Sequence, residues 1–540
     1  MRADVVRLYK TVHSWTGILA GLALFIAFYA GALTVFKEPL NRWVTPPSAA
    51  AFIPLAETPE LIRRTLAAHP ASAEDFQINL KKREDVPARL EWRERPKGAD
   101  EHDSFAGHAY AATLTVDGTE RVEEIHPAQL AEFIDALHRV VGLPFDNDPS
   151  RWVMGVIAML YGLALVSGVI VLFPSLVKDL FAFRVDRKSK RMWLDAHNIV
   201  GLLSLPFHIV IALTAAVFAY HDVIYATQDR IIHEGALASA WEGKQRSAAP
   251  AAHPRDPARM LAPELLLARV AILAPGFEPE RMQYQKVTGP RASVRIWGHD
   301  PRALSPRAQG GFVAIDPYSG RVTRADFLPG QQDAANLTLS SFFALHFASF
   351  GGIAVKWTYF LLALAGAWLF YSGNLLWIES RRKAQRGDVK VPEQRRDVRW
   401  LAAGTVGVCL GCVCGISLTI VAGKCLYGHV VDLAAWHRYV YYSAFFACIG
   451  WALRRGAANA AIELLLLGAA CTFAIPVATL LGALVPSTGL WVHTSAAALG
   501  VDLTAFAGGL CLVWIARVTA RRATQGDRDS VWSIRRPSAR

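Results

Sequence analysis

The chain has little charge for its length. Only 19% of its 540 residues are Asp, Glu, Lys or Arg, compared with roughly 25% in an ordinary soluble domain. Hydrophobic residues make up 53% of the chain. This composition does not fit a single soluble globule and indicates a membrane protein.

Three sequence features are missing, and each absence excludes a class of protein or site. The chain has no C-x-x-C-H motif, which excludes covalent attachment of a c-type haem. None of the seven cysteines lies in the two long polar segments, 37–151 and 221–352, so disulfides do not stabilise those segments. The basic segment 379–399 has no glycine-rich phosphate loop, which excludes a flavin or nicotinamide domain there.

Long apolar stretches dominate the rest of the sequence. Each has about 20 residues or more, enough for a helix to cross a hydrocarbon core of about 30 Å. The eight predicted spans are 13–36, 152–173, 196–220, 353–378, 400–422, 434–453, 457–484 and 490–515. The first apolar run is longer than that of a secretory signal, so we interpret it as a retained anchor within residues 1–36.

The basic residues indicate how these spans are oriented. They are concentrated in five segments: 1–10, the loop 174–195, the linker 379–399, Arg454 and Arg455, and the tail 516–540. These segments hold 26 basic and ten acidic residues, and all five fall on one side of the membrane. By the positive-inside rule that side is the cytoplasm, with both termini there. The formal charge of +12 therefore records orientation, and we predict no nucleic-acid partner.

The segments 37–151 and 221–352 then face outward, into the periplasm if the membrane is a bacterial inner membrane. Both are too long to be bare loops. Each shows a helix followed by strands and a turn: 59–68, 89–94 and 109–116 in the first, and 262–272, 293–297, 311–315 and 321–325 in the second. Two small α+β domains are predicted.

Histidines mark an internal repeat. His13 and His197 each open a span and are followed four residues later by a glycine, Gly17 or Gly201. Each outer segment ends in a Leu-His pair, at His138 and His346, just before the next span. A two-fold repeat is expected to bring His13 opposite His197 at the cytoplasmic end and His138 opposite His346 at the outer end.

Paired imidazoles across a helix bundle are the usual axial ligands of a b-type haem, and a glycine one turn away leaves room for the flat macrocycle. A lone histidine at a helix end is more often an interfacial polar group than a ligand, but four in two matched pairs favour ligation. His208 lies on the same helical face as His197, roughly 16 Å along the axis. It is a second-choice outer ligand, with a buried hydrogen-bonded imidazole as the alternative, and Pro206 is expected to kink its helix.

Residues 400–515 form a C-terminal extension of four further spans. His437 and His493 lie at outer ends of these spans, where they serve either a third haem or a quinol site, or an interfacial belt with the neighbouring Trp and Tyr. Asp502, within the last span, has either a role in proton coupling or a partner on a neighbouring helix. Cys409, Cys412 and Cys414 lack a second cysteine pair at metal-binding spacing and are interpreted as small packing residues.

The motifs in residues 1 to about 385 resemble those of the PepSY-associated transmembrane family. They are H-S-W-T-G at His13, A-L-H-R at His138, D-A-H-N-I-V-G-L-L-S-L-P-F-H ending at His208, A-L-H-F at His346 and V-A-I-D-P-Y-S-G-R-V at Val313. The family includes iron-regulated inner-membrane proteins and haem-containing siderophore reductases. The resemblance implies a membrane helical bundle with two periplasmic PepSY-like domains. It also implies two b haems held by His13, His138, His197, His208 and His346, and reduction of ferric siderophores.

On this hypothesis electrons cross the membrane through the two haems to a periplasmic ferric siderophore, and iron(II) is released because it binds hard oxygen chelators more weakly. The electron donor is either a quinol or a soluble reductase. Two other classes of function stay open: a haem-free scaffold or peptidase-regulating protein, and an iron or siderophore transporter coupled to protons through Asp502.

Overall fold

The computed structural model describes residues 2–48, 51–95, 107–175, 189–236, 255–307, 310–385 and 391–534, which form two compact units. A helical unit comprises Met1–Val44, Ala128–Tyr220 and Trp357–Arg540, and a sheet unit comprises Thr45–Pro127 and His221–Lys356. Parts of the predicted basic segments 174–195, 379–399 and 516–540 lie outside the described residues.

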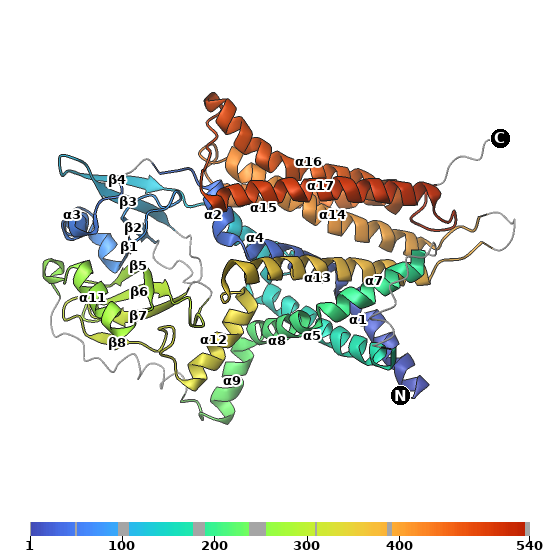
Figure 1. Ribbon diagram of the computed structural model, residues 1–540, viewed down its shortest axis with the longest axis horizontal. Helices are drawn as coiled ribbons and strands as arrows, with labels where there is room; N and C mark the ends of the chain where they lie inside the picture. The colour runs from blue at the N-terminus through green and yellow to red at the C-terminus, as the bar shows by residue number, and fades with distance from the viewer. Residues whose placement is uncertain are drawn as a thin grey trace. The chain divides into compact units, whose positions relative to one another are not determined.

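Long apolar helices build the helical unit (Figure 1). Six described helices are long and apolar enough to cross a membrane: α1 (Ala3–Thr34), α5 (Asp148–Leu172), α13 (Gly352–Ser380), α14 (Arg396–Cys425), α16 (Ala457–Leu484) and α17 (Ala496–Gln525). The pair α7 (Ser189–Leu203) and α8 (Leu205–Ala219) counts as a seventh span if one bent helix crosses. The helix α15 (Leu433–Arg455) lies where another span is predicted but is rich in Tyr, Trp and Arg, so its crossing stays a prediction. The chain is thus a multi-pass membrane protein.

The predicted kink at Pro206 is present. The axes of α7 and α8 differ by 67°, and the break falls at Ser204, with Pro206 in the first turn of α8. Proline lacks the N–H that would continue the α7 ladder, and the Ser204 hydroxyl donates to the Val200 carbonyl at 2.6 Å. The bend separates the segment of His197 from that of His208.

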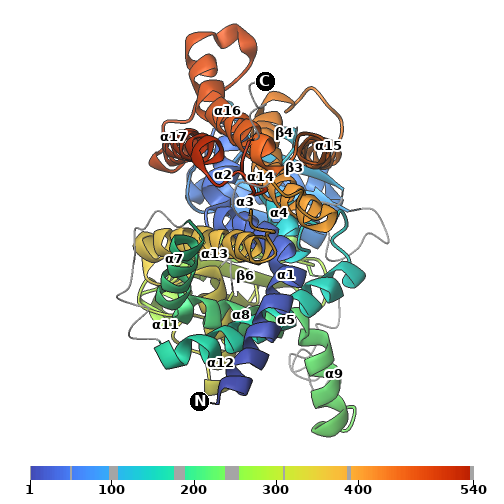
Figure 2. The ribbon, with the colours of Figure 1, turned by 90° about the vertical axis from the view of Figure 1, so that its right-hand side faces the viewer.

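Seen end-on, the helical unit has two groups of helices (Figure 2). One contains α1, α5, α7, α8 and α13, and the other contains α14, α15, α16 and α17, with α1 contacting α14. Small residues allow α14 and α15 to approach closely, because a Cβ on Gly407 would lie 2.8 Å from the Ile449 Cα. Cys409, Cys412 and Cys414 are buried free thiols in α14, in agreement with a packing role.

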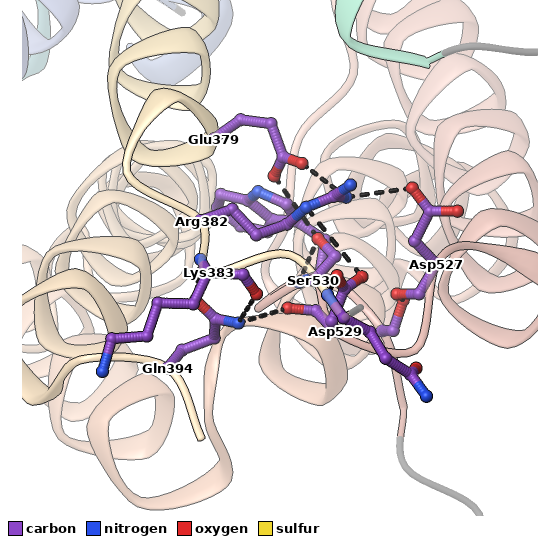
Figure 3. A network of polar contacts seen from close by, with 10 residues as sticks. Glu379, Arg382, Lys383, Gln394, Asp527, Asp529 and Ser530 are labelled. Atoms are coloured by element: carbon purple, nitrogen blue, oxygen red, sulfur yellow. Dashed lines mark hydrogen bonds and ion pairs between the residues drawn. The ribbon is translucent and has the colours of Figure 1, made fainter. Parts of the chain in front are cut away.

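The C-terminal segment after α17 is tied to the end of α13 by a polar network (Figure 3). The Arg382 guanidinium pairs with Glu379 at 2.6 Å and with Asp527 at 3.0 Å. Gln394 donates to the Lys383 carbonyl at 2.8 Å and to the Asp529 carbonyl at 2.7 Å. Glu379 lies in the last turn of α13, which belongs to the first group, and Asp527 follows α17, which belongs to the second. This network therefore joins the two groups.

The sheet unit contains one antiparallel sheet of eight strands in the order β4-β3-β2-β1-β5-β6-β7-β8. The strands are β1 (Asp75–Asn79), β2 (Leu90–Glu94), β3 (His108–Leu114), β4 (Glu120–Ile125), β5 (Glu278–Gln285), β6 (Ser293–His299), β7 (Gly311–Ile315) and β8 (Val322–Arg324). The two outer segments contribute four strands each and are joined where β1 pairs with β5, with Phe76 stacked on Tyr284 at 4.6 Å. Helices α3 (Thr58–Ala68) and α11 (Pro263–Leu273) cover the same face of the sheet and complete its apolar core (Figure 1).

Further helices flank these elements. In the helical unit, α2 (Lys37–Val44) follows α1, and α4 (Leu130–Arg139) carries His138. In the sheet unit, α9 (His221–Ile231) follows α8 in the chain, and α12 (Ala334–Phe347) precedes α13. His346 lies on α12. The histidines of the repeat are therefore distributed over both units.

Candidate functional site

His13 on α1 and His197 on α7 are neighbours, with their rings in a T-shaped arrangement. Their ring centroids are 6.5 Å apart and their planes are inclined by 73°. The two residues are 184 positions apart in the sequence and come together because α1 and α7 occupy the same group of helices. The meeting of this pair, expected from the repeat, is present in the fold.

Hydrogen bonds orient both rings in the same way. The His13 Nδ1–H donates to the Ala164 carbonyl on α5 at 2.8 Å. His197 Nδ1 lies 2.9 Å from the Ser372 hydroxyl on α13. Because that hydroxyl donates its own hydrogen to the Leu369 carbonyl, it accepts from His197. Each ring therefore keeps its lone pair on Nε2, the arrangement by which metal-ligating histidines are usually held.

The spacing of these rings fits a metal ion between them. A metal–imidazole bond is about 2 Å long and the ring centre lies roughly 1 Å beyond the nitrogen, so two imidazoles across one ion have centroids roughly 6 Å apart. A Cβ added to Gly17 would meet nothing within 4 Å, and one added to Gly201 would meet only the Leu369 side chain, at 3.8 Å. Neither glycine is packed tightly against a neighbour, so there is room for an added atom on the helix face of each histidine.

His208 lies deeper in the same group of helices and is only 2% exposed. Its Nδ1 lies 2.6 Å from the Tyr161 hydroxyl, and within the described residues its buried Nε2 has no hydrogen-bond partner. Phe28 and Phe207 pack against the ring, with centroids 5.7 and 5.5 Å away. A buried imidazole nitrogen left without a partner is costly, which makes this atom a candidate ligand.

Gly366 on α13 provides the space for His208. A Cβ at this position would lie 2.5 Å from Phe28 Cδ1 and 3.0 Å from His208 Cε1. We expect Gly366→Ala to destabilise the protein by about 1–3 kcal/mol, because both rings must shift in a packed core. Thermal unfolding in detergent measures this effect as a lower melting temperature.

Gly404→Ala on α14 is the matched control, since a Cβ there meets nothing within 4 Å. It is expected to be neutral or to stabilise by up to about 1 kcal/mol, because alanine is the better helix former. Equal melting temperatures for the two variants would contradict the packing argument at Gly366.

His138 on α4 contacts the middle of α1. Its Nδ1–H donates to the Ala27 carbonyl at 2.8 Å, and a Cβ on Gly31 would lie 2.8 Å from its Nδ1. His138 and His208 therefore both approach the stretch of α1 from Ala27 to Gly31, the first through Ala27 and the second through Phe28. The helical unit therefore places His138 and His208 near the middle of α1, and His13 and His197 together near its start.

His346 lies on α12 in the sheet unit, where its ring packs against Phe347 with centroids 5.2 Å apart. His138 belongs to the helical unit. The pairing of His138 with His346 stays a prediction, and the sequence-based set of outer ligands, His138, His208 and His346, remains open.

The C-terminal extension has a buried polar cluster around Asp502. Its carboxylate accepts hydrogen bonds from Trp43 Nε1 at 2.9 Å and from the Thr479 hydroxyl at 3.0 Å. Lys424, only 2% exposed, has its ammonium 3.4 Å from Thr479 and 4.3 Å from the centre of the Trp43 ring. Asp502 thus has partners on α2 and α16, the second of the two alternatives for this residue. Lys424 was missed from the sequence, although an ionisable residue within an apolar stretch was the available signal.

His437 on α15 is 1% exposed and packs against Phe133 of α4, with centroids 6.1 Å apart. Within the described residues both of its ring nitrogens lack hydrogen-bond partners. His493 is also buried. Neither lies in an exposed interfacial belt, and a role for them in binding a third haem or a quinol stays a prediction.

Among the described residues, no three or more His, Cys, Asp or Glu side chains gather as they would around a metal ion. A b haem needs only two axial imidazoles, so the paired histidines are the candidate site.

A family model matches most of the chain. The family model described as the PepSY-associated TM region matches residues 10–380, which contain all five histidines of the repeat and end before the C-terminal extension. No curated protein matches the chain.

Proposed function

Because the chain belongs to the PepSY-associated transmembrane family, we propose that it is an inner-membrane di-haem b protein that carries electrons across the membrane to a periplasmic ferric siderophore. The observation that supports this function best is the neighbouring pair His13 and His197, with centroids 6.5 Å apart. The hydrogen bonds at Nδ1 direct the lone pairs of both rings to Nε2.

The proposed orientation places the basic segments and both termini in the cytoplasm. It follows from the positive-inside rule, with 26 basic and ten acidic residues on that side. His13 and His197 then hold the haem at the cytoplasmic side, and the outer haem is held by two of His138, His208 and His346. The sheet unit faces the periplasm.

The protein residues have simple tasks in this proposal. When bound, haem supplies one-electron transfer. Ala164 and Ser372 fix the tautomer and angle of the histidine rings, and the surrounding apolar helices keep water away. Reduction of the siderophore iron needs no general acid or nucleophile, because the reduced ion leaves an oxygen chelator by ligand exchange. Since no flavin or nicotinamide motif is present in the basic segment 379–399, a membrane quinol or a soluble reductase must supply the electrons.

The visible spectrum of the purified full-length protein tests the haem proposal. We expect a Soret band, and α bands that appear on adding dithionite, with a pyridine haemochrome of the b type and two haems per chain. A preparation from haem-replete cells with no Soret band would overturn the proposal and favour the haem-free scaffold.

A further inference from the structure

The inference concerns the face of the sheet opposite α3 and α11. Alternate residues of each strand point to the two faces. Phe76, Val294 and Val313 belong to the helix-covered core, so their neighbours in the strands lie on the opposite face. On β6, β7 and β8 this opposite face presents arginines and aromatic rings.

Two of the arginines are held in one cross-strand row. Arg295 on β6 pairs in register with Ala314 on β7, and Ala314 pairs with Arg324 on β8. Ala314, between them on β7, has only a methyl side chain, so β7 does not fill the space between the two arginines. A third arginine, Arg307, joins this group through Phe327, which both Arg307 and Arg324 contact.

The guanidinium groups pack over aromatic rings in cation–π contacts. Phe312 and Phe327 are stacked, with centroids 5.0 Å apart and planes inclined by 13°. Arg295 lies 5.4 Å from the centre of Phe312, while Arg324 and Arg307 lie 4.9 and 5.1 Å from the centre of Phe327. We call the set of Arg295, Arg307, Arg324, Phe312 and Phe327 the arginine–aromatic face.

The positive charge of this face is poorly neutralised. Arg324 pairs with Asp326 at 2.7 Å, but within the part of the chain that the structure describes neither Arg295 nor Arg307 has a carboxylate within 4.0 Å. Burial and the neighbouring Arg324 charge lower the pKa of both guanidinium groups. The Asp75 carboxylate raises the pKa of Arg295. Both oxygens of Asp75 already accept from the Gln283 amide, at 3.1 Å.

Three converging arginines, of which only Arg324 is paired with a carboxylate among the described residues, are suited to an anion. Their planar groups on aromatic rings are suited to a flat, aromatic one. We propose that the arginine–aromatic face binds an iron(III) chelate of the catecholate class, which is anionic and presents aromatic rings around the metal. This deepens the proposed function by naming its substrate class, and it rests on that function. A neutral hydroxamate chelate lacks both the charge and the rings.

Binding of a redox-inert analogue tests the inference separately from electron transfer. The probe is the gallium(III) tris-catecholate chelate, titrated by calorimetry into the full-length protein in detergent. Arg295→Gln and Arg307→Gln are each expected to weaken binding by roughly tenfold or more, the usual loss for a hydrogen bond to a charged group. Arg295→Lys keeps the charge but not the planar group and is expected to fall between wild type and Arg295→Gln.

Arg121→Gln is the matched control. Arg121 lies on β4 at the far edge of the same sheet and is paired with Glu123 at 2.5 Å, so its loss should leave affinity unchanged. The neutral gallium(III) trihydroxamate chelate should bind at least tenfold more weakly than the catecholate. Equal affinity for the two chelates, or undiminished binding in the Arg295→Gln/Arg307→Gln double variant, would refute the inference.

The visible spectrum of the same preparations keeps this outcome separate from the fate of the haem proposal. A haem-containing protein that does not bind the catecholate overturns only the arginine–aromatic face. A haem-free protein that binds it overturns only the electron-transfer function. Retention of the wild-type melting temperature in the glutamine variants shows that any loss of binding comes from the removed guanidinium groups.

Discussion

His197→Ala is expected to remove one haem from the protein and leave the other. The alanine cannot ligate a metal, and His13 then loses the imidazole whose ring lay 6.5 Å away, on the side proposed to be cytoplasmic. Loss of one haem of two should roughly halve the haem content per chain. His13→Ala should give the same result, whereas His138→Ala should affect the outer haem and spare the cytoplasmic one.

Haem content and the low-temperature α bands of the dithionite-reduced protein measure these changes. Ser372→Ala removes only the partner of His197 Nδ1 and should lower haem affinity by about 10- to 100-fold without abolishing binding. His108→Ala is the control: His108 is an exposed residue of the sheet unit paired with Glu124 at 2.7 Å, and its loss should leave both haems in place. Two haems in each of the His13, His197 and His138 variants would show that these residues are not ligands.

Much of the helical unit was predictable because its signals are local. A stretch such as 457–484, with almost no charge, has only the helix available to it in lipid, and α16 occupies it. The meeting of His13 and His197 was predictable because the repeat places two similar helices in similar surroundings. Pro206 carried its own signal, since proline removes a backbone hydrogen bond within a helix and favours a kink there.

The sheet was less predictable because its joining strands look polar. β5 alternates polar and apolar residues as a strand does, but its only large apolar residues are Met282 and Tyr284, and Pro279 near its start weakens the pattern. β1 has five residues and was missed for the same reason. Their pairing, which makes one sheet from two distant segments, depends on a contact between positions about 200 residues apart, and no local pattern carries that information.

The partners of the candidate site were also out of reach of the sequence. Ser372 orients His197, and Tyr161 contacts His208, but each lies on a different helix from its histidine. A serine or tyrosine in an apolar helix is common, and most such serines donate to a carbonyl of their own helix. Only the placement of α13 beside α7, and of α5 beside α8, distinguishes these two residues from the others.

Removing the Asp502 carboxylate is expected to destabilise the C-terminal extension strongly. Asp502→Leu removes the 2.9 Å acceptor of the Trp43 N–H, which keeps only the Thr479 hydroxyl at 3.1 Å. It also leaves the buried Lys424 ammonium without the carboxylate charge. Removing the charged acceptor of a buried hydrogen bond costs about 1–3 kcal/mol, so we expect a clear drop in melting temperature in detergent. Glu463→Gln is the matched control, because its pair with Arg455 at 2.6 Å is exposed and costs less than about 1 kcal/mol to lose.

The double variant Lys424→Met/Asp502→Leu decides between the two roles considered for Asp502. If the cluster is structural, removing both charges restores part of the lost stability, because no uncompensated charge stays buried, and the protein keeps its haems and still reduces its acceptor. If Asp502 instead moves protons, the double variant regains stability but not activity. We expect the first result, since the carboxylate already receives two hydrogen bonds, from Trp43 and Thr479, that hold it between α2 and α16.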